Sequence, residues 1–352
     1  MVTKSEISCR SGAIDIVRVL AILSIIKVHS SLTEPLWNIY CEFLDPGPGV
    51  VYFFFLAALF TKPDTLLVYK RAGWLFGCFL FWGVMTYMFL SPVTSWLTGC
   101  ISGGMTKLVW PSLMDIPLNH ILLWDMRKVF PHYGVLWFLR LLLLLSIVSP
   151  FLMRLPRYVL VVLGCAFFSV RYTCLVTSPE YSEYLPFVLT AGWPSASVAV
   201  YLFGLALNKA GGLKLCLHYG RRLFPLAAVI CMCQLIFIFT GYKGILADEI
   251  LIMVPFALCS LIMSLERCGF VQKVGGFVSR HAACIFTVYI LHPMFNSVVY
   301  AAGDAWFDGA VLRGYHMLMP VLVFGLCWLM YLALVRIPHC SMLLCFVPRK
   351  KV

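Results

Sequence analysis

The chain has 352 residues, of which 62% are hydrophobic and only 12% are charged, and its mean hydropathy is +0.92. Soluble domains carry about 25% charged residues, so this composition excludes a soluble enzyme and indicates an all-α, polytopic integral membrane protein. The formal net charge of +12 does not indicate nucleic-acid binding, because the basic residues lie in short loops between apolar runs, where they orient a membrane protein.

A spanning helix needs about 20 mostly apolar residues, and ten runs of the sequence are candidates. The first run is not followed by a small-residue cleavage site, so we expect it to remain as a span. We find no internal repeat and no soluble domain, which predicts one helical bundle and a single membrane domain over residues 1–352. The runs lie near 14–32, 47–61, 72–90, 134–153, 158–177, 193–208, 223–240, 245–265, 282–301 and 315–336.

The basic residues predict how the bundle is oriented. With the N-terminus inside, 18 Lys and Arg residues fall in inner loops and 5 in outer loops, which predicts that both termini face the cytoplasm. The long stretch 91–133 then lies outside, and we expect it to cover the bundle as a cap or an interfacial helix. The 15 cysteines form no C-x-x-C pair, so we expect neither a metal site nor a disulfide framework.

The first apolar run contains four residues that a membrane tolerates poorly, namely Asp15, Arg18, Lys27 and His29. A charge near the bilayer centre costs about 2.5–3.5 kcal/mol on insertion scales, so such residues usually carry function. Arg18 and His29 are separated by three turns plus about 20°, so they share one helix face, about 16 Å apart along the axis. One stripe therefore carries a fixed cation near the cytoplasmic end and a titratable base in the outer third.

Structural explanations of the same residues are also open. Asp15 and Arg18 could simply pair at i, i+3 near the interface. A histidine near a helix end could be a hydrated interfacial residue. Lys27 faces elsewhere, and we expect its amine to extend to the surface without a functional role.

Two later segments add further cations. The segment YKRAGW, 69–74, places Lys70 and Arg71 at the cytoplasmic side, although topology alone could explain them. The segment YGVLWFLRLLLLLSIVSP, 133–150, opens the fourth span with Trp137 and Arg140. If that span runs from outside to inside, Arg140 lies at a depth similar to that of His29.

A late segment, TVYILHPMF at 287–295, places Tyr289 and His292 in the middle of a span, directly before a proline that kinks the helix. Taken alone, His292 could make a structural hydrogen bond within the bundle. Buried cations or imidazoles on three separate spans are less easily explained by structure alone, so all of these residues are candidates for one site.

In their order along the chain, these segments resemble the acyltransferase-3 family of integral-membrane acyl transferases. The first span is similar to its Arg-x10-His segment, and FFFLAALF, 53–60, lies where the family shows FF-x-x-SGF-like sequence. LWFLR…SP and YILHP resemble signatures of its fourth and late helices. The similarity runs from about residue 14 to 336, with the ten spans that the family has.

The resemblance implies an O-acyltransferase of the bacterial inner membrane. It would move an acyl group, usually acetyl, from cytoplasmic acyl-CoA to a hydroxyl of a cell-envelope glycan or lipid-linked sugar. His29 would then be the catalytic base or a transient acyl carrier, and Arg18 and Arg71, with Lys70 beside them, would contact the phosphates or carbonyl of the donor. Acyl-CoA (acetyl-CoA) would be a co-substrate, and no permanently bound cofactor is expected.

The sequence departs from the family's pattern at three places. Trp74 stands where the family often has a second arginine, three residues after Arg71. Ala57 and Ala58 replace a Ser-Gly pair, and Leu141 replaces an aspartate. These departures could weaken the binding of the acyl donor. A family member without catalytic activity therefore stays an alternative.

The residue types themselves suit acyl transfer. Imidazole, with a pKa near 6.5, can take the proton of an attacking hydroxyl, and a guanidinium can stabilise the oxyanion by about 2.7–4 kcal/mol. The phosphates of CoA also need cations at the inner face. A transporter or flippase for a glycan or lipid-linked substrate would carry buried cations too, but we expect it to show repeats or paired broken helices.

Overall fold

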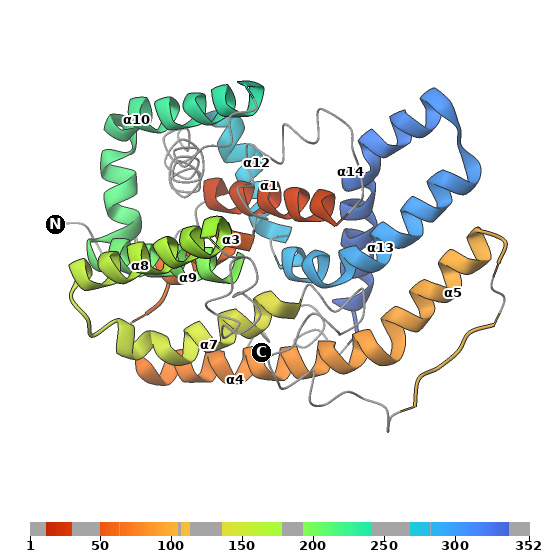
Figure 1. The fold of residues 1–352 in the computed structure, drawn as a ribbon, viewed down its shortest axis with the longest axis horizontal. Helices are drawn as coiled ribbons and strands as arrows, with labels where there is room; N and C mark the ends of the chain where they lie inside the picture. Colours follow the sequence, from red (N-terminus) through yellow and green to blue (C-terminus); the bar gives the residue numbers. More distant parts are fainter. Residues whose placement is uncertain are drawn as a thin grey trace.

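The computed structural model describes most of the chain, and every regular element in the described part is helical (Figure 1). This confirms the all-α class that the composition predicts. The described residues are 12–29, 50–62, 64–104, 107–112, 136–177, 193–240, 268–281 and 283–337.

The elements are labelled as in Figure 1. In chain order they are α1 (Gly12–Val28), α3 (Val50–Leu59), α4 (Thr65–Met85), the π-helical segment η2 (Thr86–Leu90), α5 (Ser91–Ile101), α7 (Trp137–Leu152), α8 (Arg157–Thr177), α9 (Trp193–Lys209), α10 (Gly212–Thr240), α12 (Gly269–His281), α13 (Cys284–Trp306) and α14 (Gly309–Leu334).

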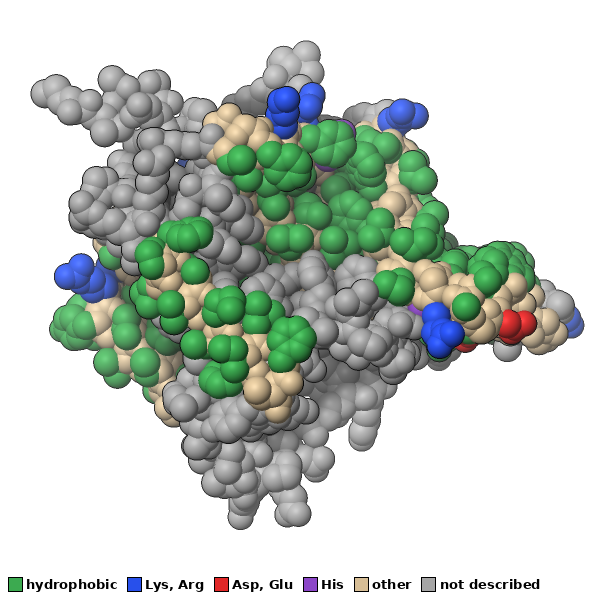
Figure 2. All heavy atoms as spheres, turned by 90° about the horizontal axis from the view of Figure 1, so that it is seen from above, with side chains coloured by type: hydrophobic (Ala, Val, Ile, Leu, Met, Phe, Trp, Pro, Cys, Tyr) green, Lys and Arg blue, Asp and Glu red, His purple; other side chains and the backbone are tan. Residues whose placement is uncertain are grey.

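Some of the described helices have the length, and part of the described surface has the apolar character, of a membrane protein. Three stretches, Thr65–Ile101, Cys284–Trp306 and Gly309–Leu334, are long and apolar enough to cross a bilayer. Figure 2 shows hydrophobic side chains over much of the described surface on one face, with Lys and Arg at its margins, which is typical of a membrane-contacting surface. The count of ten spans and the cytoplasmic termini stay predictions, and the run 245–265 lies outside the described residues.

The third helical stretch begins seven residues earlier than the apolar run predicts. Asp64 caps α4, because its Oδ1 accepts hydrogen bonds from the backbone N–H of Leu66 at 3.0 Å and of Leu67 at 3.3 Å. Such a cap satisfies N–H groups that the first turn leaves without intrahelical partners. Lys70 and Arg71 therefore lie on the second turn of a helix instead of in a loop.

The same stretch also ends later than predicted, since helix continues to Ile101 inside the segment 91–133 that the sequence suggested as an outer cap. The π-helical turn η2 precedes α5, and Pro92 lies in the first turn of α5, where its missing N–H is tolerated. Residues 107–112 are irregular, and 113–135 lie outside the described residues.

Helix α1 occupies the middle of the assembly (Figure 1) and packs against α3, α12, α13 and α14. Its residues between Arg18 and His29 form part of the core: Ile22, Ile25 and Ile26 are completely buried. The stripe that carries the two candidate residues is thus held rigidly by neighbouring helices.

Two features of the packing were not predicted from the sequence. Helix α12 falls between two apolar runs, in a segment interpreted as a cytoplasmic loop. Helices α3 and α9 approach closely at Gly204, where a Cβ would lie 2.8 Å from the Cβ of Ala58 and 2.9 Å from the carbonyl oxygen of Phe55. Ala58, where the resemblance implies a glycine, is therefore accommodated by a glycine on the facing helix.

This close approach predicts that Gly204→Ala destabilises the protein. The added methyl group has to push α3 and α9 apart, at a cost of about 1–3 kcal/mol. Gly73→Ala on α4 is the matched control, because nothing lies within 4 Å of its Cβ position, and helix propensity should make it neutral or slightly stabilising. Thermal unfolding of the purified protein in detergent measures both, and equal melting temperatures for the two variants would contradict the predicted packing.

Candidate functional site

Arg18 is both ion-paired and turned towards a cavity. Its Nη1 lies 2.8 Å from Oδ1 of Asp15, whose side chain is buried, while 28% of the Arg18 side chain is exposed. The structural explanation and the functional one are therefore compatible: the carboxylate neutralises the guanidinium in the bundle, and the guanidinium still reaches open space.

That space is a cavity of about 220 Å³ between α1, α3, α4, α7 and α13, called here the central cavity. Arg18 and Arg71 supply its charge. The rest of the lining is almost entirely apolar and includes Phe53, Phe138, Leu142, Phe286 and Tyr289. Two cations beside an apolar chamber can bind a molecule that combines an anionic part with an apolar or uncharged arm.

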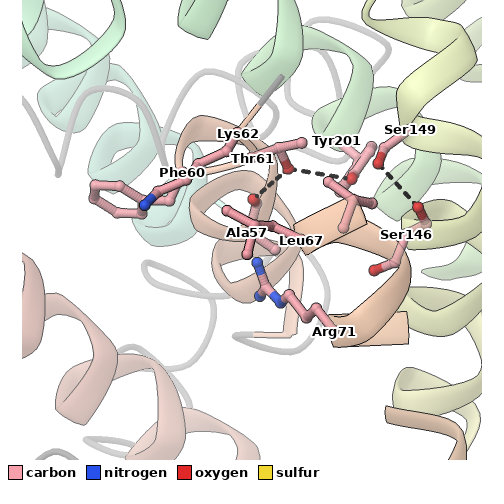
Figure 3. Close-up of a pocket in the computed structure, with 10 residues that line it drawn as sticks. Ala57, Phe60, Thr61, Lys62, Leu67, Arg71, Ser146, Ser149 and Tyr201 are labelled. Atoms are coloured by element: carbon pink, nitrogen blue, oxygen red, sulfur yellow. Dashed lines mark hydrogen bonds between the residues drawn. The ribbon is translucent and has the colours of Figure 1, made fainter. Parts of the chain in front are cut away.

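A second cavity of about 280 Å³, the polar cavity, lies between α3, α4, α7 and α9 (Figure 3). Arg71 and Ala57 line both cavities, so Arg71 stands where they adjoin. The polar cavity also presents a second cation and a set of hydroxyl groups, from Lys62, Thr61, Ser146, Ser149 and Tyr201.

The hydroxyl groups of the polar cavity are held in place by the helices that carry them. Thr61 Oγ1 donates to the carbonyl oxygen of Ala57 at 2.9 Å and lies 3.5 Å from the Tyr201 hydroxyl. Ser149 Oγ donates to the Ser146 carbonyl oxygen at 2.9 Å (Figure 3). These hydroxyl protons are used inside the protein, so Lys62 and Arg71 are the groups of this cavity that can donate to phosphate oxygens.

His29 and His292 lie together, although 263 positions separate them in the sequence. Their ring centroids are 5.1 Å apart, with the planes inclined at 46°. His29 follows the last turn of α1, where its backbone N–H still donates to the Ile25 carbonyl oxygen at 3.3 Å. The side chain of His292 is fully buried, whereas that of His29 is exposed.

The surroundings of His292 define its tautomer. Its Nδ1 lies 2.8 Å from the Tyr289 carbonyl oxygen and 3.3 Å from that of Val288. Carbonyl oxygens only accept hydrogen bonds, so the network assigns the proton to Nδ1 and leaves Nε2 as an acceptor. This Nε2 is buried and makes no hydrogen bond with the part of the chain that the structure describes.

Tyr289 connects the histidine pair with the central cavity. Its ring lines that cavity, and its centroid lies 6.0 Å from that of His292 and 5.0 Å from that of Phe138. Five predicted site residues, Arg18, Arg71, Tyr289, His29 and His292, thus belong to one continuous region.

Three other candidates lie elsewhere. Lys70 is exposed on α4, beside Arg71, and among the described residues it lines neither cavity. Trp137 packs near Phe54, with ring centroids 6.1 Å apart. Arg140 is buried on α7 but is turned about 100° round the helix from the cavity-lining Leu139.

Asn296 is a structural residue of the site that the sequence reasoning missed. Its side chain is buried, and its Nδ2 donates to the Ile26 carbonyl oxygen at 2.9 Å. The bond joins α13 to α1 one turn below His29, so it fixes the distance between the two histidines. The sequence does contain a signal for Asn296, because it lies four residues after His292 and so on the same helix face. Ser146 and Ser149 had no comparable signal, because only the fold turns them towards Arg71.

The comparisons with known proteins give one match. The sequence model of a family described as "Acyltransferase domain" matches residues 11–335, which is nearly the whole chain and contains every residue of the region described above. No curated protein and no solved structure matches the chain.

The link between α1 and α13 predicts a loss of stability in Asn296→Ala. An interhelical hydrogen bond in a membrane bundle is worth about 0.6–1.7 kcal/mol, so the melting temperature should fall measurably. Ser297→Ala is the matched control, because Ser297 Oγ donates only to the Pro293 carbonyl oxygen of its own helix, at 3.0 Å. If Ser297→Ala lowers the melting temperature as much as Asn296→Ala, the interhelical bond does not have this role.

Proposed function

The chain belongs to the acyltransferase-3 family, and from this premise we propose that it transfers an acyl group, preferably acetyl, from cytoplasmic acyl-CoA to a hydroxyl of a cell-envelope glycan or lipid-linked sugar. The observation that carries the proposal is that Tyr289, which lines the chamber with Arg18 and Arg71, has its ring 6.0 Å from that of His292, which in turn lies 5.1 Å from His29. A base and a donor-binding region are both required for transfer from a thioester to an alcohol.

In the proposed reaction the acceptor hydroxyl attacks the thioester carbonyl carbon. His29 takes the hydroxyl proton, the new carbon–oxygen ester bond forms, and the carbon–sulfur bond breaks. The proton then passes from the imidazole to the departing thiolate, so that CoA leaves as the free thiol. General-base assistance of this kind contributes about 10²–10⁴-fold.

His292 is suited to orient His29. Because its Nδ1–H is directed at backbone carbonyl oxygens, its buried Nε2 can only accept a hydrogen bond. A ring separation of 5.1 Å leaves room for one bond from a ring N–H of His29. Accepting that bond would leave the other ring nitrogen of His29 as the base, as in catalytic groups where a third residue fixes the tautomer of a histidine.

The two cavities suit the two parts of the donor. Lys62 and Arg71 of the polar cavity suit the phosphates, and the central cavity suits the uncharged pantetheine arm and the thioester. Trp74, which replaces the family's second arginine, packs against the core. Arg18 and Arg71 remain as the two cations of the central cavity.

The same proposal assigns the protein to the bacterial inner membrane as a multi-pass protein that contacts lipid directly. The bias of Lys and Arg towards one set of loops and the apolar exterior (Figure 2) support it. Donor would enter from the cytoplasm near Arg71, and acceptor would approach His29 from the other side. His29 directly follows α1 and lies about 16 Å from Arg18 along the helix axis, so donor and acceptor would reach the site from opposite ends of this helix.

Sealed vesicles of both orientations test the proposed direction of transfer. Inverted vesicles expose the cytoplasmic face, so acetyl-CoA labelled in its acetyl group should label the glycan or lipid-linked sugar fraction. Right-side-out vesicles should stay unlabelled, because CoA does not cross the membrane. Vesicles with His29→Ala provide the background, and equal labelling by this variant would contradict the proposal.

Substitution of two adjacent cations, Arg71 and Lys70, tests donor binding through the KM for acetyl-CoA. Arg71→Ala removes the cation shared by both cavities and should raise the KM for acetyl-CoA about tenfold or more, since a charge-assisted bond to phosphate contributes about 1.5–3 kcal/mol. Lys70→Ala should have a smaller effect, because its side chain is exposed outside both cavities. Steady-state kinetics at saturating acceptor gives both values, and the reverse ranking would exclude the proposed donor site.

A further inference from the structure

A hydrogen bond outside the two cavities connects α12 with Arg18. Ser279 Oγ on α12 donates to Oδ2 of Asp15 at 2.8 Å, and Oδ1 of the same carboxylate accepts from Arg18 Nη1 at 2.8 Å. The Asp15 side chain is buried, and its two oxygens accept from two helices, Oδ1 from α1 and Oδ2 from α12. Ser279, Asp15 and Arg18 thus form a chain of contacts that ends at the central cavity.

The two helices reach this contact by an unusually close crossing. A Cβ built on Gly275 would lie 2.8 Å from Cα of Gly12, and one built on Gly12 would lie 2.7 Å from Cα of Gly275. Cβ atoms essentially never come so close to a backbone, so only glycine fits on either side. Ser279 follows Gly275 by one turn and Asp15 follows Gly12 by nearly one turn, so the crossing brings the hydroxyl to the carboxylate.

The hydroxyl limits the freedom of the carboxylate, and through it that of Arg18. Rotation of the Asp15 carboxylate would carry the bound Arg18 side chain with it. A second hydrogen bond from another helix fixes the plane of the carboxylate, and a guanidinium bound to a fixed carboxylate has a defined direction. Buried ionic groups need such additional hydrogen bonds to offset their desolvation.

We infer that Ser279 is a positioning residue for Arg18, acting through Asp15, and that the docking of α12 on α1 determines how Arg18 faces the acyl donor. The inference rests on the proposed function, because Arg18 is assigned to the donor there. Ser279 itself touches neither cavity in the part of the chain that the structure describes. Its effect should therefore appear in donor binding rather than in the chemical step.

Ser279→Ala tests the hydroxyl directly. The KM for acetyl-CoA should rise roughly threefold to tenfold, with kcat unchanged within about twofold, because an interaction lost from donor binding alone changes KM and not kcat. Ser279→Thr keeps the hydroxyl and should restore most of the wild-type KM. A fall in kcat with unchanged KM in Ser279→Ala, or no rescue by threonine, would overturn the inference.

A pair of neighbouring glycines tests the docking of α12 without touching a polar group. Gly275→Ala adds a methyl group against the backbone of Gly12 and should raise the donor KM as Ser279→Ala does. Gly276→Ala, one residue further on, has nothing within 4 Å of its Cβ position and should leave the donor KM at the wild-type value. Equal KM values in the two glycine variants would contradict the role of the crossing.

A melting experiment separates this inference from the proposed function. If Ser279 and Arg18 are coupled through Asp15, the melting-temperature shifts of Ser279→Ala and Arg18→Gln should not add in the double variant. Wild-type protein that fails to bind acetyl-CoA while these shifts stay non-additive would refute the proposed function and leave the coupling supported. Additive shifts would refute the coupling, whatever the protein binds.

Discussion

The ion pair between Asp15 and Arg18 is the interaction on which the proposed site depends. A guanidinium on a central helix of a membrane bundle needs a neutralising partner, and Asp15 supplies it from the same helix at 2.8 Å. This arrangement lets Arg18 point into the central cavity without an isolated charge. Between Arg18 and the end of the helix, Ile22, Ile25 and Ile26 are completely buried, so the helix presents a cation at one end and an imidazole at the other.

Neighbouring helices hold α1 at both of these ends. At the Arg18 end, α12 crosses over Gly12 and Ser279 bonds to Asp15; at the His29 end, α13 bonds to the Ile26 carbonyl oxygen through Asn296 and places His292 beside His29. The two ends are therefore set independently. Such an arrangement is expected of a site where one end binds a donor and the other performs the proton transfer.

The sequence predicted the parts of this arrangement that depend on local pattern. The apolar runs predict the all-helical class. The charged and titratable residues inside those runs predict the stripe of Arg18 and His29 and the candidate His292. Helix α12 could not be predicted, because it is short and rich in glycine and gains stability by packing on α1 and, through Phe277 and His281, on Trp328 of α14. Arg140 was grouped with the site by depth alone, but depth does not determine which face of α7 a side chain occupies. The alternatives of a transporter or a non-catalytic member also share these local patterns. A transporter should differ by repeats or paired broken helices, and a non-catalytic member by the absence of turnover at the site.

The most direct test of the central claim compares binding with turnover in one protein. Purified wild-type protein should bind acetyl-CoA and release its thiol slowly, while His29→Ala should bind acetyl-CoA with the same affinity and release almost none. This result would assign His29 to the chemical step and leave the cations to bind the donor. Full thiol release by a folded His29→Ala protein, or no acetyl-CoA binding by the folded wild type, would contradict the account.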